Sequence, residues 1–309
     1  MTISGTVCPV GDVGEVRAAA RTIAGRVRRT PLLDATVDGR SVLLKLEHLQ
    51  RSGSFKLRGA LNALLCGPRP DQVITASGGN HGLGVATAAA MLDLPATVFV
   101  PQTVPPGKAR RIEAAGAKLI RRGTSYAQAA TAAIVAAAAP GIRYISAYDD
   151  PAVIAGQGTV ALEVLADAPD VDTIAVAAGG GGLAAGTALA AEGHTTAAVE
   201  PEHCRSVHDA LVAGQPVDSP IDSVAASALG ASRAGELPLQ ILQDRDVVSI
   251  LVSDAEILAA VDLLWEEFRL AVEPAAATPF AAWCAGRIPG ARPCVVLCGA
   301  NTEWSHADG

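Results

Sequence analysis

The chain has 309 residues, of which 50% are hydrophobic and 18% are charged, and its formal net charge at pH 7 is −7. This length and composition are typical of a large globular protein with a substantial core, and they exclude a disordered chain. The acidic balance argues against nucleic acid as the main partner, because phosphate-binding surfaces carry an excess of Lys and Arg.

The N-terminal stretch MTISGTVCPVGDVGE lacks the basic and apolar regions of a secretory signal. No run approaches the roughly 18 apolar residues of a membrane span. We therefore expect no membrane contact and a cytoplasmic location. The cysteines at positions 8, 66, 204, 284, 294 and 298 form no C-x-x-C pair, so we expect thiols and no disulfides.

The first informative element is RSGSFKLRGALNALL, residues 51–65. From Leu57 onward its apolar residues recur at helical spacing, and Ser54 stands where an N-cap is expected. This places Lys56 in the first turn, where the helix dipole disfavours a cation. Lys56 is then either an exposed lysine or a Schiff-base lysine whose amine pKa is lowered by the positive end of the helix. This stretch alone leaves both interpretations open.

After residue 70, short β-branched runs alternate with Ala-rich helical runs. The expected strands are QVITAS, ATVFV, AKLIRR, RYISAY, DTIAVAA, TAAVE, DVVSILV and PCVVLC. The alternation predicts an α/β fold with parallel sheets covered by helices. Ser253 is expected to cap one late helix, and Pro274 fits the first position of the next.

Two expected strand-to-helix loops are rich in glycine, ASGGNHGLG and AAGGGGLAAG. Such loops leave backbone N–H groups free to bind an anion at a helix N-terminus. The second loop lacks the GK[ST] of a P-loop. Its Gly180, Gly182 and Ala185 fit the G-x-G-x-x-A pattern of a dinucleotide site, with Glu200 as the acid that would bind the ribose. The loop alone therefore leaves pyridoxal phosphate and NAD open.

The other motifs separate these ligands. A nicotinamide enzyme has no need of a Ser-Phe-Lys helix start or of an Asn-centred glycine loop. Pyridoxal phosphate needs a lysine for its Schiff base, a cradle for its phosphate, a donor to its ring oxygen and a group beside its ring nitrogen. The sequence therefore favours pyridoxal phosphate.

Several motifs in order resemble the threonine dehydratase, serine dehydratase and serine racemase group of fold type II pyridoxal-phosphate enzymes, the tryptophan synthase β-like fold. They are SGSFKLRGALNAL, TASGGNHGLGVA, VPQTVPPGKARRIEAAGA, PAVIAGQGTVALEVL, AAGGGGLAAG, VEPAAA and VLCGAN. The resemblance implies two doubly wound parallel-sheet domains with the cofactor between them, in a homodimer. Residues 1–67 and 147–309 would form the large cofactor-binding domain, and residues 68–146 the small domain that carries the substrate-carboxylate loop.

The resemblance also implies the site residues. Lys56 is the Schiff-base lysine and the acid/base at the substrate α-carbon. The other implied cofactor contacts are Phe55 near the ring, Asn80 at the ring oxygen, Gly179, Gly180, Gly181, Gly182 and Leu183 at the phosphate, and Cys298 at the ring nitrogen. The implied substrate-carboxylate loop contains Ser77, Gly78, Asn80 and His81.

The implied reaction is β-elimination of L-threonine, L-serine or both, giving a 2-oxo acid and ammonia. Racemizing relatives have a serine where this chain has Gly78, which favours dehydration over serine racemization. Cysteine synthases, which catalyse β-replacement, resemble S-V-K-D-R at the lysine, whereas this chain has SFKLRG. These two activities and a more distant NAD-binding protein are the alternatives.

Some features remain open at this stage. Glu200 fits one acid of a metal site found in some relatives, but Ser206 occupies the position of the second, so the metal is doubtful. Of the other potential ligands nearby, Glu202, His203, Cys204 and His208, we expect only surface roles. Glu273 either lies near the active site or only begins a helix. Residues 225–237 are expected to build part of the pocket for the substrate side chain. The chain end leaves no room for the regulatory domain of biosynthetic threonine dehydratases, so feedback inhibition by isoleucine is not expected.

Overall fold

The computed structural model describes residues 11–245 and 247–302 of the chain, and these form two separate sheets. The large sheet has the order β1-β2-β10-β7-β8-β9 and the small sheet the order β5-β4-β3-β6. The strands of the large sheet are β1 (Leu32–Val37), β2 (Arg40–Lys45), β7 (Thr173–Ala177), β8 (Thr195–Pro201), β9 (Val247–Val252) and β10 (Pro293–Val296). Those of the small sheet are β3 (Gln72–Ala76), β4 (Ala96–Val100), β5 (Lys118–Arg121) and β6 (Ile142–Tyr144).

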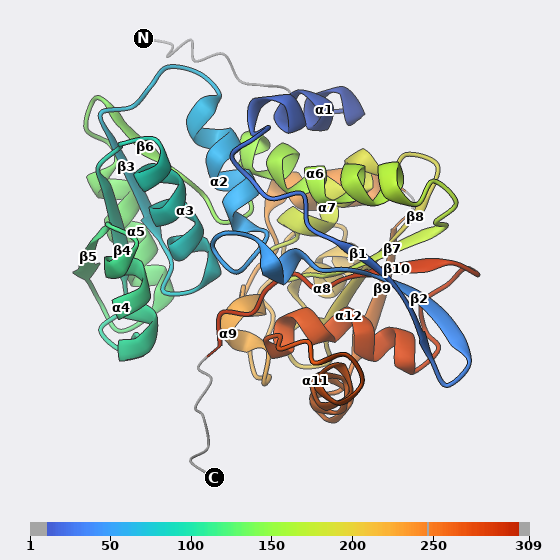
Figure 1. The fold of residues 1–309 in the computed structure, drawn as a ribbon. Helices are drawn as coiled ribbons and strands as arrows, with labels where there is room; N and C mark the ends of the chain where they lie inside the picture. The colour runs from blue at the N-terminus through green and yellow to red at the C-terminus, as the bar shows by residue number, and fades with distance from the viewer. Residues whose placement is uncertain (1–10, 246, 303–309) are drawn as a thin grey trace.

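Helices cover both faces of the large sheet (Figure 1). On one side lie α1 (Val13–Thr22), α6 (Pro151–Asp167) and α7 (Gly182–Ala190), and on the other lie α11 (Asp254–Phe268) and α12 (Pro274–Cys284). The remaining helices of this part are η1 (Glu47–Leu49), α8 (Ser206–Ala213), α9 (Ala226–Leu229) and α10 (Glu236–Gln243). Buried Val, Ile and Ala residues of the strands pack between these layers as one core, as expected when both faces of a parallel sheet are covered.

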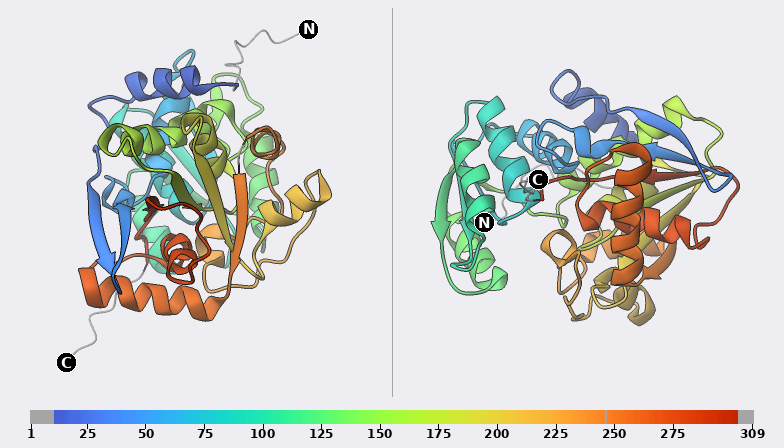
Figure 2. Two further views of the ribbon diagram at one scale, coloured as in Figure 1. Left: turned by 90° about the vertical axis from the view of Figure 1, so that its right-hand side faces the viewer. Right: turned by 60° about the horizontal axis from the view of Figure 1, so that its bottom comes forward.

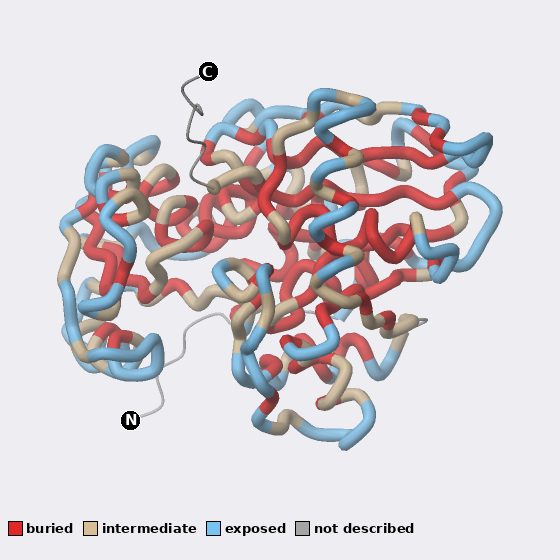
Figure 3. Tube along the Cα trace, turned by 90° about the horizontal axis from the view of Figure 1, so that it is seen from below, coloured by how far each residue is buried: buried red, intermediate tan, exposed pale blue. Residues whose placement is uncertain are grey.

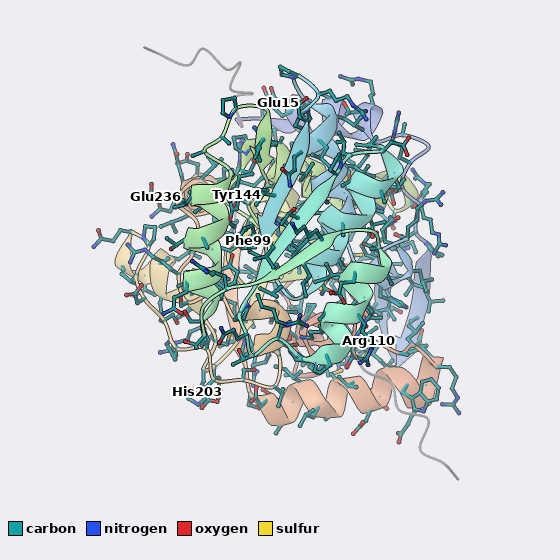
Figure 4. All side chains as sticks on the ribbon, turned by 90° about the vertical axis from the view of Figure 1, so that its left-hand side faces the viewer. Glu15, Phe99, Arg110, Tyr144, His203 and Glu236 are labelled. Carbon is teal, nitrogen blue, oxygen red and sulfur yellow. The ribbon has the colours of Figure 1, made fainter. Side chains whose placement is uncertain are left out.

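The small sheet is covered in the same way. Helices α3 (Asn80–Met91) and α4 (Pro106–Ala114) pack on one face, and α5 (Tyr126–Ala136) packs on the other. Phe99 and Tyr144 belong to the face beneath α5 (Figure 4). Helix α2 (Lys56–Leu65) packs against both α3 and α6, so it joins the two lobes that stand side by side in Figure 2.

The buried residues follow the division of the chain into two lobes. Buried segments run through the interior of each lobe and exposed segments form the outer loops (Figure 3). No helix within residues 11–245 and 247–302 is long and apolar enough to cross a membrane. Four of the cysteines, at positions 204, 284, 294 and 298, are free thiols as expected, and Cys8 lies outside the described residues.

All eight strands expected after residue 70 are present. Their pairing is parallel throughout, which confirms the predicted α/β class. The caps are also confirmed: Ser253 forms a capping box with Glu256, and Pro274 begins α12. The predicted RYISAY strand is shorter than expected, because β6 ends at Tyr144.

The sequence prediction missed the hairpin of β1 and β2, which pair antiparallel at the edge of the large sheet. Asp38 and Gly39 both have positive φ at its turn. Asp-Gly is the strongest short signal for such a turn, because type I′ geometry needs positive φ at both positions. That signal was present in the sequence and could have identified the hairpin.

The prediction that Ser54 caps α2 is wrong. The residue before the helix is Phe55, which makes no side-chain cap bond. Ser54 instead lies in a bridge with Gly299, and its buried hydroxyl has no hydrogen-bond partner among the described residues. Pairing with the segment after β10 therefore overrides the local preference for a cap.

Candidate active site

A cavity of ≈ 350 Å³ opens where the carboxyl ends of β3 and β4 face those of β7 and β10. Ligands of open parallel sheets gather at such ends. The residues implied by the resemblance all line it: Phe55 and Lys56 from the start of α2, Ser77, Gly78, Asn80 and His81 from the loop after β3, Gly179, Gly180, Gly181, Gly182 and Leu183 after β7, and Cys298 after β10. One cavity thus collects segments from both lobes.

Lys56 is the first residue of α2, and its Nζ donates to the carbonyl oxygen of Ala147 at 2.7 Å. The ammonium also lies 5.0 Å from the centre of the Phe55 ring. Burial lowers the pKa of Lys56 to about 8. The cause differs from the expected helix dipole, but the result is the same: a neutral, nucleophilic amine is accessible near neutral pH.

The loop after β3 leads into the N-terminus of α3. Its Ser77 hydroxyl accepts a hydrogen bond from the N–H of Gly79 at 3.2 Å, and Asn80 begins the helix. Burial, together with the positive charge of Lys56, lowers the pKa of His81 to about 3. The neutral imidazole donates from Nε2 to the carbonyl oxygen of Ile145 at 3.1 Å. His81 therefore ties the loop to the end of β6, and the backbone N–H groups of the helix start remain the natural anion donors.

The glycine loop after β7 forms the opposite wall. Gly181 has φ +92°, a left-handed conformation that favours glycine, and α7 begins at Gly182. A Cβ at Gly180 would lie 2.3 Å from the ring of Tyr148, and one at Gly182 would lie 2.9 Å from the same residue. Only glycine fits in this cradle, whose helix N-terminus presents unpaired N–H groups for a phosphate.

Cys298 is buried beside Lys56 and Phe55. Its carbonyl oxygen accepts from the N–H of Phe55 at 3.1 Å, which fixes the segment after β10 next to the start of α2. Burial, reinforced by the nearby Glu273 carboxylate, raises the pKa of Cys298. The thiol is therefore neutral, a weak hydrogen-bond partner that carries no charge to a ring nitrogen.

Glu200 tests the rival interpretation of the glycine loop. It stands next to the end of β8, where a ribose-binding acid would stand, but both carboxylate oxygens already accept backbone N–H groups, from Val207 at 2.9 Å and His208 at 2.7 Å. Burial raises its pKa to about 8. This carboxyl group caps α8 and does not face a ribose.

The surroundings of Glu200 also test the possible metal site at Glu200 and Ser206. Ser206, at the position of the second acid, donates from its hydroxyl to the carbonyl oxygen of Gly179 at 2.9 Å. Across residues 11–245 and 247–302, no three His, Cys, Asp or Glu side chains group as metal ligands would. The region around Glu200 therefore supports the glycine loop through hydrogen bonds.

Sequence reasoning missed several side chains at this site. Tyr148 packs against the glycine loop, and Tyr126 and Lys108 line the cavity from the small lobe. Glu273, for which two roles were open, stands before α12 but points to Asn80, whose Nδ2 donates to its Oε1 at 2.5 Å. Of the segment 225–237, residues 226–232 line the cavity. Of Tyr148, Tyr126 and Lys108, only Tyr148 had a signal in the sequence, because the consecutive glycines indicate that another group packs closely against them.

A buried lysine amine, a glycine cradle at a helix N-terminus and a neutral thiol line one cavity, and these are the groups that a phosphate-bearing aldehyde cofactor needs from a protein. Residues 23–299 match the family described as "Pyridoxal-phosphate dependent enzyme", and the chain belongs to that family. This membership resolves the choice of cofactor in favour of pyridoxal phosphate.

Individual relatives are similar over most of the chain. An L-threonine ammonia-lyase of Geobacter sulfurreducens is 38% identical, over 93% of this chain and 75% of that protein. The crystal structure of a threonine deaminase from T.th. superposes with a TM-score of 0.89 at 35% identity, covering 96% of this chain and 100% of that one. Maize serine racemase gives a TM-score of 0.88 at 28% identity, covering 96% and 95%. The fold type II architecture is thereby confirmed.

Replacing Gly180 with alanine is expected to weaken pyridoxal phosphate binding by roughly 5- to 150-fold, the equivalent of the 1–3 kcal/mol that overpacking costs. The added methyl group would displace the Tyr148 ring and disturb the cradle. Titration of the cofactor-free protein, followed by visible absorbance, measures the change. Gly11→Ala is the matched control, because a Cβ at Gly11 meets no atom within 4 Å. Unchanged affinity in Gly180→Ala would show that the phosphate is held elsewhere.

Proposed function

We propose that this chain is a pyridoxal-phosphate-dependent ammonia-lyase that converts L-threonine, and L-serine as a second substrate, into a 2-oxo acid and ammonia. The observation that carries the proposal is the placement of the Lys56 amine in a cavity that also holds the α3 N-terminus and the glycine cradle. The names and similarity of the relatives support threonine as the substrate.

Each residue has a proposed task. Lys56 binds the cofactor and then carries the proton to and from the substrate α-carbon. The loop of Ser77, Gly78, Asn80 and His81 orients the substrate carboxylate at the start of α3. When bound, pyridoxal phosphate accepts the electron pair left at the α-carbon. Because the Cys298 thiol is neutral, it does not hold a proton on the ring nitrogen, which favours prompt loss of the β-hydroxyl.

The surroundings of Gly78 favour elimination over racemization. A Cβ at this position would lie 2.8 Å from a methyl carbon of Val104. A serine, the second acid of racemizing relatives, would therefore fit only if Val104 moved. We propose that reprotonation on the second face of the substrate is poor here, because Gly78 has no side chain that could act as the second acid.

The organisation expected from the sequence belongs to the same proposal. We propose a large domain of residues 1–67 and 147–309 and a small domain of residues 68–146, since the two sheets fall on either side of this division. A homodimer in the cytoplasm is the proposed state. Light scattering of the purified protein tests the dimer.

The direct test incubates the cofactor-loaded protein with L-threonine, L-serine or O-acetylserine plus sulfide, and measures 2-oxo acid, ammonia, D-amino acid and cysteine. The expected result is equal amounts of 2-oxo acid and ammonia from L-threonine, with little D-amino acid. Cysteine formation without 2-oxo acid would replace the proposal with β-replacement. Accumulation of D-serine as the main product would replace it with racemization.

A further inference from the structure

Asn80 is held from both sides by residues far away in the sequence. Its Oδ1 accepts from Nδ2 of Asn301 at 2.7 Å, and its own Nδ2 donates to Oε1 of Glu273 at 2.5 Å. Asn80 and Glu273 are buried, 8% and 4% exposed. These bonds link the start of α3 to the segment after β10 and to the start of α12.

The direction of these bonds is set by a backbone carbonyl. Asn301 Nδ2 also donates to the carbonyl oxygen of Ser52 at 2.9 Å. A carbonyl oxygen can only accept, so the NH₂ group of Asn301, not its oxygen, must face Ser52. Both hydrogens of that NH₂ group are then used, one on Ser52 and one on Asn80. The side chain of Asn301 therefore has one orientation.

The fixed orientation of the Asn301 amide also determines the orientation of the Asn80 amide. Its oxygen must face Asn301, so its NH₂ group faces Glu273 and the cavity that both residues line. One of its two hydrogens binds Glu273, and the other remains for a ligand. A reversed amide would present an oxygen to the cavity and would leave Glu273 facing another acceptor.

Asn301 is itself held by the segment that leads to Lys56. Gly53 has φ +73°, and a Cβ there would lie 2.6 Å from Asn301 Oδ1. The N–H of Ala300 donates to the carbonyl oxygen of Gly53 at 2.9 Å. Since Gly53 precedes Lys56 by three residues, one anchored segment positions both the lysine and the Asn80 amide.

We infer that Asn301 is a positioning residue, which fixes the Asn80 amide with its NH₂ group toward the ring oxygen of the cofactor. This inference rests on the proposed role of Asn80 as the donor to that oxygen. It gives a role to Glu273, whose purpose the sequence left open, and to Asn301, the last residue of the VLCGAN motif.

The test is Asn301→Asp, which keeps the shape but replaces the NH₂ group with an acceptor. The carboxylate would face the Ser52 carbonyl and would draw the Asn80 NH₂ group away from the cavity. We expect cofactor binding to weaken by roughly 10- to 100-fold, the value of one hydrogen bond to a charged group. We also expect the visible absorption maximum of the bound cofactor to shift, which a general loss of stability would not cause. Thr302→Ala, next along the chain, is the control that should leave both unchanged.

A double-mutant cycle separates positioning from a direct effect. In an Asn80→Ala background, adding Asn301→Asp should change cofactor affinity by less than about twofold. An equal loss of affinity in both backgrounds overturns the inference, as does an Asn301→Asp protein with the affinity and spectrum of the parent. If Asn301→Asp does not fold, Asn301→Ala serves in the same cycle, with a smaller expected loss and the same overturning outcomes. Because these readouts need no substrate, failure to consume threonine defeats the proposed function and leaves this test intact.

Discussion

Replacing Lys56 with alanine is expected to lower kcat/KM for threonine by on the order of 10⁴-fold, because one change removes both the proposed covalent anchor and the proposed acid/base at the α-carbon. The cofactor-free variant should keep its fold, since the Lys56 amine makes one hydrogen bond, to Ala147. Steady-state kinetics and the visible spectrum of the loaded protein measure the effect. The variant should lose the absorbance of lysine-bound cofactor and regain some activity with added small amines.

Lys118→Ala is the matched control, because Lys118 is exposed at the start of β5 and is not one of the residues that line the cavity. The lowered pKa of Lys56 adds a pH dependence with a definite sign. Only the neutral amine attacks the aldehyde, so capture of the cofactor by the parent protein should slow about tenfold per unit below pH 8 and level off above it. A Lys56→Ala protein with parental turnover would show that another amine performs the chemistry.

The sequence predicted those parts of the site that depend on local chemistry. Buried parallel strands appear as β-branched runs, and the cradle appears as consecutive glycines because the Tyr148 ring and a positive φ exclude side chains. Lys56 could be singled out because a lysine in a first helical turn needs an explanation. Such signals are contained within a few residues.

The remaining features depend on contacts between distant segments. Asn80 and Asn301 are 221 residues apart in sequence, and Asn80 and Glu273 are 193 apart. No local pattern indicates that an asparagine will meet another at such a separation. The failed cap at Ser54 has the same cause, since the segment that pairs with it, at Gly299, comes from the far end of the chain. The β1–β2 hairpin differs, because its Asp-Gly turn was a readable signal.

Arg58, two residues after Lys56 on α2, is the centre of a cluster of ion pairs between α2, α6 and the segment that follows β1. It is fully buried, and its guanidinium binds Glu47 at 2.6 Å and Glu163 at 2.7 Å. Lys45, also fully buried, binds the same Glu163 at 2.7 Å. Two cations thus balance two carboxylates, and the cluster fixes the helix turn that presents Lys56.

Replacing Arg58 with methionine is therefore expected to lower the free energy of unfolding by about 3–5 kcal/mol, because the buried carboxylate of Glu47 and the partly buried one of Glu163 are left with one cation, Lys45. Urea unfolding of the cofactor-free protein measures this loss. Arg29→Met is the matched control: its pair with Asp167 lies at the surface, where the side chains are 57% and 33% exposed, and such pairs contribute about 0–1 kcal/mol. Equal losses in the two variants would contradict a special role for the buried cluster.

The same cluster predicts how stability responds to acid. Burial alone would raise the pKa of Glu163, but hydrogen bonds and charge from Arg58 and Lys45 outweigh it and lower the pKa below its ordinary value. A carboxyl group whose pKa is lower in the folded state stabilises the protein above its unfolded pKa, near 4.3, and loses that contribution as pH falls through the folded value. The parent should therefore lose stability below about pH 4.5 more steeply than Arg58→Met, in which Glu163 has lost one of its two cations. Parallel pH profiles of unfolding free energy would show that acid acts on the fold through other carboxylates.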